Sequence, residues 1–179
     1  MKTAVIVVDM LNTYDHPDAE PLAESVEKVL PNIAELIRRA RVDDGTLLVY
    51  VNDNHEQWQE TREGLVRQAL EGERPDLIEP IKPPTDVPFI MKGRHSAFYQ
   101  SALDHVLQVK GVEKAILCGQ VTEQCIQYSA LDAYIRGYDV AVPRDAVAHI
   151  NPDWAEASFG MMEKNMHADL TPVADGVLA

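Results

Sequence analysis

Short β-type runs alternate with helical patterns along almost the whole chain, and this alternation constrains the fold more than any other feature. The candidate strands cover residues 3–8, 46–51, 88–91, 114–117, 139–142 and, more weakly, 170–173. Strands separated by helices are typical of a parallel sheet with helices packed on its faces. The sequence therefore predicts an α/β fold of three layers, a doubly wound and mostly parallel sheet with helices on both sides.

Three helices are expected from the spacing of apolar side chains. Apolar residues recur at helical intervals in 22–37, and a shorter pattern of the same kind occupies 99–109. Residues 152–167 form the third, with Asn151 suited to be its N-cap and Pro152 its first position. These helices account for most of the covering layers.

The segment 52–86 departs from the alternation. It is polar at first, then weakly helical, then rich in proline. A long segment at the carboxyl end of a strand suits the lid or wall of a pocket, and it suits a surface excursion or a contact between subunits equally well. We expect the whole chain, 1–179, to form one domain, since this length supports a full core.

Composition narrows the class of partner. The net charge of −13 argues against binding to nucleic acid or to an anionic membrane, which leaves a small molecule as the expected partner. The apolar run 4–8 is too short for a signal sequence or a membrane span. Cys118 and Cys125 lie too close together for a useful disulfide, which fits a reducing compartment. A cytoplasmic location is expected.

Cys125 follows the apolar run 115–117 and precedes the helical pattern at 126–134. A thiol in the first turn of a helix faces unpaired N–H groups and a partial positive charge, which favour the thiolate. The carboxyl edge of an open α/β sheet is also where ligands bind. The position predicts a cysteine nucleophile.

Asp9 and Lys92 share this location in the fold. Asp9 ends the first strand and Lys92 ends the third, so both are expected at the same sheet edge as Cys125. A carboxylate close to a thiol can act as its base, and a lysine can hold that carboxylate ionised. Each residue alone fits a turn or a solvated surface, and it is their coincidence that indicates a catalytic site.

The stretches around these residues resemble the isochorismatase-like cysteine hydrolases, which include nicotinamidases, N-carbamoylsarcosine amidases and ureidoacrylate amidases. The matching stretches are Val7-Val8-Asp9-Met10-Leu11-Asn12, Lys92-Gly93-Arg94-His95-Ser96-Ala97-Phe98, Gly119-Gln120-Val121-Thr122-Glu123-Gln124-Cys125, Ala133-Tyr134-Ile135-Arg136-Gly137-Tyr138-Asp139-Val140 and Asp145-Ala146. The resemblance implies a triad of Asp9, Lys92 and Cys125. It also implies six parallel strands in the order 3-2-1-4-5-6 and a homodimer or homotetramer.

The implied reaction is hydrolysis of a C–N bond in a small amide, ureide or lactam, through a thioester on the cysteine and without a cofactor. The family also implies a cis peptide bond between Gln120 and Val121, which would turn the Val121 N–H toward the same point as the Cys125 N–H. Two such groups form an oxyanion hole, and losing one donor typically costs roughly 3 kcal/mol of barrier lowering.

The sequence departs from nicotinamidases at their metal site. Those enzymes carry an Asp-x-His and a further histidine, and here Asp53 and His55 are followed by a stretch, 56–72, without histidine. Two ligands make a poor metal site, so no metal is expected. Asp53 and His55 are expected to line the pocket and to hydrogen-bond the substrate.

Further side chains are candidates for contact with the substrate: Asn12, Trp58, Ser96, Phe98 and Tyr128. Structural roles compete for several of them, since Phe98 suits the core, Trp58 an interface and Tyr128 helix packing. Cys118 lies at the end of a buried strand and is expected to be a small core residue. Contact with the substrate is one role open to His95 and His149, and a position at the surface or in structural hydrogen bonds is favoured for both.

Other functions remain to be separated from amide hydrolysis. A binding protein that kept the fold without catalysis is one, and an ether hydrolase of the isochorismatase type is another, although true isochorismatases commonly lack this cysteine. A nucleotide-dependent enzyme is disfavoured, because the turn 9–21 contains no glycine for a phosphate loop.

Overall fold

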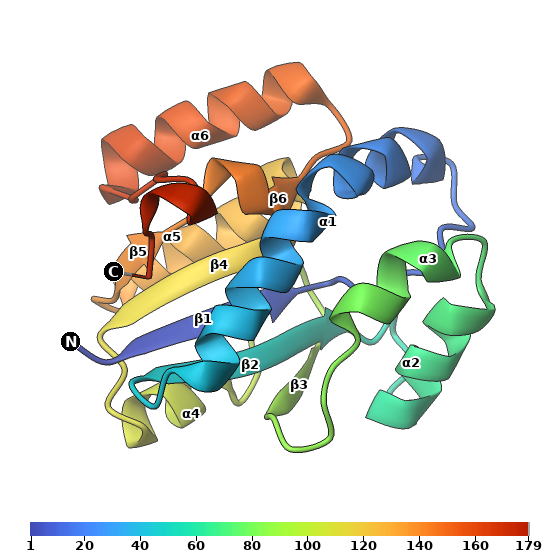
Figure 1. Cartoon of the computed structure of the whole chain (residues 1–179), viewed down its shortest axis with the longest axis horizontal. Coiled ribbons are helices and arrows are strands. Elements are labelled where there is room, and N and C mark those ends of the chain that lie inside the picture. Colours follow the sequence, from blue (N-terminus) through green and yellow to red (C-terminus); the bar gives the residue numbers. More distant parts are fainter. Residues whose placement is uncertain (179) are drawn as a thin grey trace.

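Six parallel strands form the centre of the fold (Figure 1), and the predicted α/β class is confirmed. The computed structural model describes residues 1–178. Its strands are β1 (Thr3–Val8), β2 (Thr46–Asp53), β3 (Phe89–Lys92), β4 (Lys114–Gln120), β5 (Asp139–Ala141) and β6 (Val147–Ala148). Its α-helices are α1 (Ala19–Val42), α2 (Arg62–Glu71), α3 (Pro75–Ile78), α4 (Leu103–Val109), α5 (Gln127–Ile135) and α6 (Pro152–Met166).

The first strand lies in the middle of the sheet, between β2 and β4. The order β3-β2-β1-β4-β5 agrees with the prediction. Residues 4–8 are all buried, as expected for a central parallel strand covered on both faces. Val8 pairs with Val51 on one side and with Gly119 on the other, so the carboxyl ends of the three central strands lie level.

The sixth strand is not where the order 3-2-1-4-5-6 placed it. Val147 and Ala148 pair with the last residues of β4, beyond the point where the short β5 has ended. The stretch predicted as a strand, 170–173, has no strand; just before it, Asp169 makes one isolated parallel bridge to Ala141. Proline at position 172 has no N–H to donate, which prevents a regular ladder there.

Side chains alternate between two separate cores, one on each face of the sheet. Val5 and Val7 of β1 pack with α1, whereas Ala4, Ile6 and Val8 pack with α4, α5 and α6. This alternation is the period of two that a strand imposes. In Figure 1, α1 crosses one face of the sheet while α4 and α5 lie behind the other, which gives the three layers that were predicted.

Helix boundaries follow local capping. In α6, Asn151 accepts hydrogen bonds from the N–H groups of Asp153 and Trp154, and Pro152 is the first residue, both as predicted. The helix predicted at 99–109 begins only at Leu103. Among residues 1–178, no helix combines the length and the apolar character needed to cross a bilayer.

The segment 52–86 contains α2, α3 and the 3-10 turn Glu79–Ile81. Most of its apolar residues belong to the core on the α1 side, where Leu65, Leu77 and Ile78 are buried. The segment is therefore an integral part of that layer. Three of its residues line the cavity described below: Asn52, Asp53 and His55.

Candidate active site

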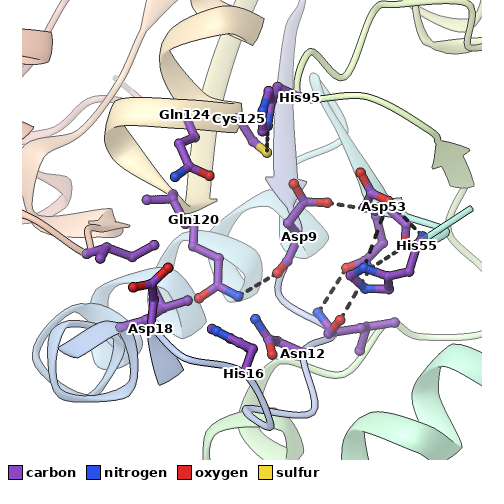
Figure 2. A pocket seen from close by; sticks show the side chains of 15 residues that line it. Asp9, Asn12, His16, Asp18, Asp53, His55, His95, Gln120, Gln124 and Cys125 are labelled. Carbon is purple, nitrogen blue, oxygen red and sulfur yellow. Dashed lines mark hydrogen bonds and ion pairs between the residues drawn. The ribbon is translucent and has the colours of Figure 1, made fainter. Parts of the chain in front are cut away.

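Asp9 follows the last residue of β1, and two neighbours fix its carboxylate (Figure 2). Its Oδ1 accepts a 2.7 Å hydrogen bond from the backbone N–H of Asp53, and its Oδ2 lies 2.8 Å from Nζ of Lys92. The backbone of Asp9 is left-handed, with a φ of 54°. Residues other than glycine adopt this conformation mostly at turns and functional sites.

Lys92 ends β3, and its side chain is completely buried. Besides Asp9, its Nζ lies 3.2 Å from Oδ2 of Asp53, 2.9 Å from the Arg94 carbonyl oxygen to which it donates, and 3.6 Å from Sγ of Cys125. A buried charge is tolerated only where opposite charges and hydrogen bonds compensate for lost water. The ammonium group thus joins the carboxylates to the thiol.

Cys125 lies in a π-helical turn, Thr122–Ile126, that leads into α5. The sequence predicted an ordinary helical turn there, and the wider turn is a detail that propensity does not show. Thr122 Oγ1 donates a 2.9 Å hydrogen bond to the Ala148 carbonyl, and the Glu123 carboxylate accepts from two backbone N–H groups after β6. Such turns recur at functional sites because they displace one side chain from the helical path.

Gly119 lets β1 and β4 approach closely beside the site. Its φ is 115°, and a Cβ atom there would lie 2.2 Å from the Val8 carbonyl oxygen. The next residue, Gln120, donates a 2.7 Å hydrogen bond from Nε2 to the backbone carbonyl of Asp9. Together these contacts hold the turn that carries Cys125 next to Asp9.

The peptide bond between Gln120 and Val121 is cis, as the resemblance predicted. Val121 then begins the turn, and its carbonyl accepts hydrogen bonds from the N–H groups of Gln124 and Ile126. Val121 and Cys125 both line the cavity beside Asp9.

Burial and charge set the protonation of the site. Burial raises the pKa of the Cys125 thiol above its ordinary range, the Asp9 carboxylate raises it further, and Lys92 opposes this only in part. Burial lowers the pKa of Lys92, but the charge and hydrogen bond of Asp9, together with the charge of Asp53, raise it, and the net direction is upward. The resting site therefore holds a neutral thiol and a charged lysine. The expected preference for the thiolate is wrong for this state, because burial outweighs the helix terminus.

A cavity of about 390 Å³ opens beside Cys125 and has the size of a small-molecule site. Of the predicted residues, those that line it are Asp9, Asn12, Asp53, His55, Val121 and Cys125. Figure 2 shows the Asp9 carboxylate beneath the sulfur, with Asp53 and His55 on one side. Lys92 is not among the lining residues, and its side chain is completely buried.

Trp58 and Ser96, predicted to contact the substrate, lie outside the cavity. The Trp58 side chain is 78% exposed and covers Gly93. The Ser96 hydroxyl donates a hydrogen bond to the Asp132 carboxylate and accepts one from the Phe98 N–H. Each side chain is thus directed to a neighbour away from the thiol.

Phe98 and Tyr128 also lie outside the cavity. Phe98 is buried in the core near the Tyr138 ring, with the Arg136 guanidinium over its face. Tyr128 is half exposed on α5 and stacks on the ring of His95 at 5.6 Å between centroids. Tyr128 reaches the site only through that histidine.

Several lining residues were not predicted: His16, Asp18, His95, Gln120 and Gln124, with Leu11, Leu22, Asn52 and Ile150 between them. His95 is the most significant, since its Nδ1 lies 3.7 Å from Sγ of Cys125. Its position three residues after Lys92 was the available signal. The loop from Asp9 to α1 also leaves the sheet at its carboxyl edge, which could have indicated His16 and Asp18.

Asp53 and His55 do not fit a metal site. The Asp53 carboxylate is engaged by the Lys92 ammonium through Oδ2 and by the His55 backbone N–H through Oδ1. In the described part of the chain, no three His, Cys, Asp or Glu side chains are grouped so that they could hold an ion. These two side chains are instead part of the polar wall.

The fold and the site together define an α/β protein with Asp, Lys and Cys gathered at the carboxyl edge of a parallel sheet. The isochorismatase domain matches residues 3–175, and the chain belongs to that family. It is 32% identical to the isochorismatase family protein YaaI of Bacillus subtilis, over 94% of this chain and 92% of that one.

Two further similarities bear on chemistry. The maleamate amidohydrolase of Pseudomonas putida is 30% identical, with 88% of this chain and 78% of the enzyme covered. The pyrazinamidase of Pyrococcus horikoshii, solved in complex with zinc, superposes with a TM-score of 0.75 at 29% identity, over 96% of this chain and 99% of that chain. Both relatives are named for amide hydrolysis.

Proposed function

We propose that this chain is an amidohydrolase that cleaves a C–N bond of a small amide, ureide or lactam, with Asp9, Lys92 and Cys125 as its catalytic triad. The observation that carries the proposal is the position of Lys92, whose Nζ contacts the Asp9 carboxylate at 2.8 Å and the Cys125 sulfur at 3.6 Å. The amide hydrolases among the relatives support the same class of reaction.

In the first half of the reaction, Asp9 takes the proton from Sγ of Cys125 and the sulfur attacks the carbonyl carbon. The neutral thiol of the resting site makes this base necessary. The carbonyl oxygen becomes an oxyanion, which the backbone N–H groups of Val121 and Cys125 stabilise. Lys92 pairs with the Asp9 carboxylate at 2.8 Å and offsets the charge of the thiolate as it forms.

In the second half, Asp9 returns its proton to the leaving nitrogen, the C–N bond breaks, and an acyl group remains on Cys125 as a thioester. A water molecule then enters beside Asp9. The Asp9 carboxylate takes a proton from this water as the water oxygen attacks the thioester carbon. The C–S bond breaks, the proton passes to the sulfur, and the carboxylic acid leaves. No cofactor is needed for this cycle.

Ammonia release from a panel of primary amides, ureides and cyclic lactams tests the proposal. For ureides and lactams that release no ammonia, mass spectrometry detects the ring-opened or cleaved product. We expect at least one compound to be hydrolysed and the rate to fall by at least about 10³-fold in Asp9→Asn, since base and orientation are both lost. Hydrolysis unchanged in Asp9→Asn would refute the assignment, and a panel bound but never cleaved would favour the binding protein.

A further inference from the structure

The charge of the cavity wall indicates what kind of amide the site accepts. Three carboxylates line the cavity, those of Asp9, Asp18 and Asp53, and no arginine or lysine in residues 1–178 belongs to the lining. The basic side chains on this wall are histidines, and the remaining polar ones are amides. A substrate that carries a carboxylate would meet groups of like charge there, of which Asp9 and Asp53 share the Lys92 ammonium group.

Lys92 cannot serve as a partner for a substrate carboxylate. Its side chain has no exposed surface, and its Nζ is already shared by Asp9, Asp53 and the carbonyl of Arg94. The guanidinium of Arg94 itself pairs with Glu56 at 3.2 Å. Lys92 and Arg94 are therefore both engaged by other groups of the protein.

Asp18 sets the charge at the far side of the cavity. It is the residue before the first turn of α1, yet its side chain makes no capping hydrogen bond. Figure 2 shows Asp18 well separated from Cys125, with Gln120 between them. A helix N-terminus ordinarily favours an anion. Here that position already carries the Asp18 carboxylate, so negative charge occupies the N-terminus of α1.

We propose that the substrate is an uncharged polar amide, whose acyl part carries no carboxylate and whose far end has a hydrogen-bonding group that faces Asp18. The side-chain amides of Asn12 and Gln124 line the same cavity and suit such a group. The inference rests on the proposed function, since it assumes that the acyl carbon lies at Cys125. It separates this chain from its maleamate-hydrolysing relative, because maleamate is an anion.

Maleamide and maleamate form a matched pair, since they differ only in whether the far end is a carboxamide or a carboxylate. We expect kcat/KM for maleamide to exceed that for maleamate by at least about 30-fold in the wild type, because the carboxylates that line the cavity repel the carboxylate of maleamate. Equal values, or a preference for maleamate, would overturn the inference.

Two substitutions assign the preference to Asp18. Asp18→Asn should reduce the ratio by about tenfold, and Asp18→Arg should bring it to about one or below, since each step removes negative charge. Asp15→Asn is the matched control: Asp15 is a nearby exposed acid outside the lining, and its replacement should leave the ratio unchanged. A ratio that does not respond to Asp18→Arg would also overturn the proposal.

A turnover-independent assay keeps this inference distinct from the proposed function. In a Cys118→Ala background, ethyl, 2-aminoethyl and 2-sulfonatoethyl methanethiosulfonate each place a different charge beside Cys125. The Cys125 sulfur forms a disulfide with each reagent and methanesulfinate leaves. Relative to a free thiol, the sulfonate reagent should react at least about tenfold more slowly than the neutral one. Equal reaction rates for the three reagents would overturn the inference about charge and leave the proposed function in place. No reaction with any reagent would overturn the proposed function, and with it this inference.

Discussion

Cys118 and Cys125 lie in one strand and turn unit, and both are buried thiols. The pKa of each is raised, to about 12 for Cys118, with burial as the main cause in both. Their neighbours differ. Cys118 Sγ contacts the carbonyl of Ile6 at 3.7 Å, whereas Cys125 Sγ faces Nζ of Lys92 at 3.6 Å and Nδ1 of His95 at 3.7 Å. Burial is thus common to both thiols, and the polar neighbours distinguish the proposed nucleophile, Cys125, from Cys118.

The largest effect should separate the two cysteines by activity. Cys125→Ala should lower amide hydrolysis by at least about 10⁴-fold, because the nucleophile is lost. Cys118→Ala should leave kcat/KM within about threefold, since that side chain only fills the core. Ammonia release under identical conditions measures both. The reversed pattern would mean that the wrong thiol has been assigned.

The next effect concerns the ammonium group of Lys92, which lies beside Cys125 and not beside Cys118. Lys92→Met should reduce the free energy of unfolding by about 3–5 kcal/mol, because Asp9 and Asp53 are left as neighbouring carboxylates without their shared cation. Lys82→Met, which removes an exposed pair with Glu79, should change it by less than about 1 kcal/mol. Urea unfolding compares the two, and equal losses would show that the buried ammonium is not structurally required.

The Cys118 thiol should change how the free energy of unfolding depends on pH. Its folded pKa of about 12 exceeds the ordinary value of 9.0, so above pH 9 the unfolded chain loses a proton that the folded chain keeps. Wild-type stability should therefore fall by about 1.4 kcal/mol for each pH unit above 9, relative to Cys118→Ala. Urea unfolding between pH 8 and 10.5 measures the difference. Parallel curves for the two proteins would contradict the burial argument.

The smallest effect sharpens the role of the second neighbour of Cys125. His95→Gln should slow alkylation of Cys125 by iodoacetamide about tenfold, because the sulfur loses a polar contact that helps the thiolate form. Tyr128→Phe keeps the ring that stacks on His95 and should change the rate by less than about twofold. Quenched mass spectrometry gives both rates. No change in His95→Gln would show that the His95 contact does not help the thiolate form.

The fold could be predicted because each main strand is an uninterrupted apolar run, which a parallel sheet buried on both faces requires. The proximity of Asp9, Lys92 and Cys125 followed from the same runs, since each of these residues comes at or a few positions after a strand end. β6 was not predictable, because two residues give no periodic signal. Phe98 was misjudged as pocket because a core aromatic and a pocket aromatic have the same local pattern.

The protonation state of the site also could not be predicted from the sequence. A helix terminus suggested a thiolate, but the depth of Cys125 and its distance from Asp9 exist only in the folded chain. The contribution of Asp18 depended on the path of an aperiodic loop. These features depend on tertiary contacts rather than on local pattern.

The covalent acyl-enzyme is the most direct test of the central claim. Trypsin leaves both cysteines on one peptide, 115–136, so the measurement uses the Cys118→Ala variant. The variant is mixed with an amide that the protein hydrolyses, and the reaction is quenched in acid within the first turnover. Mass spectrometry should find the acyl mass on Cys125, with its appearance preceding release of the acid. Hydrolysis that continues in Cys125→Ala, or turnover with the acyl group never found on this sulfur, would contradict the account.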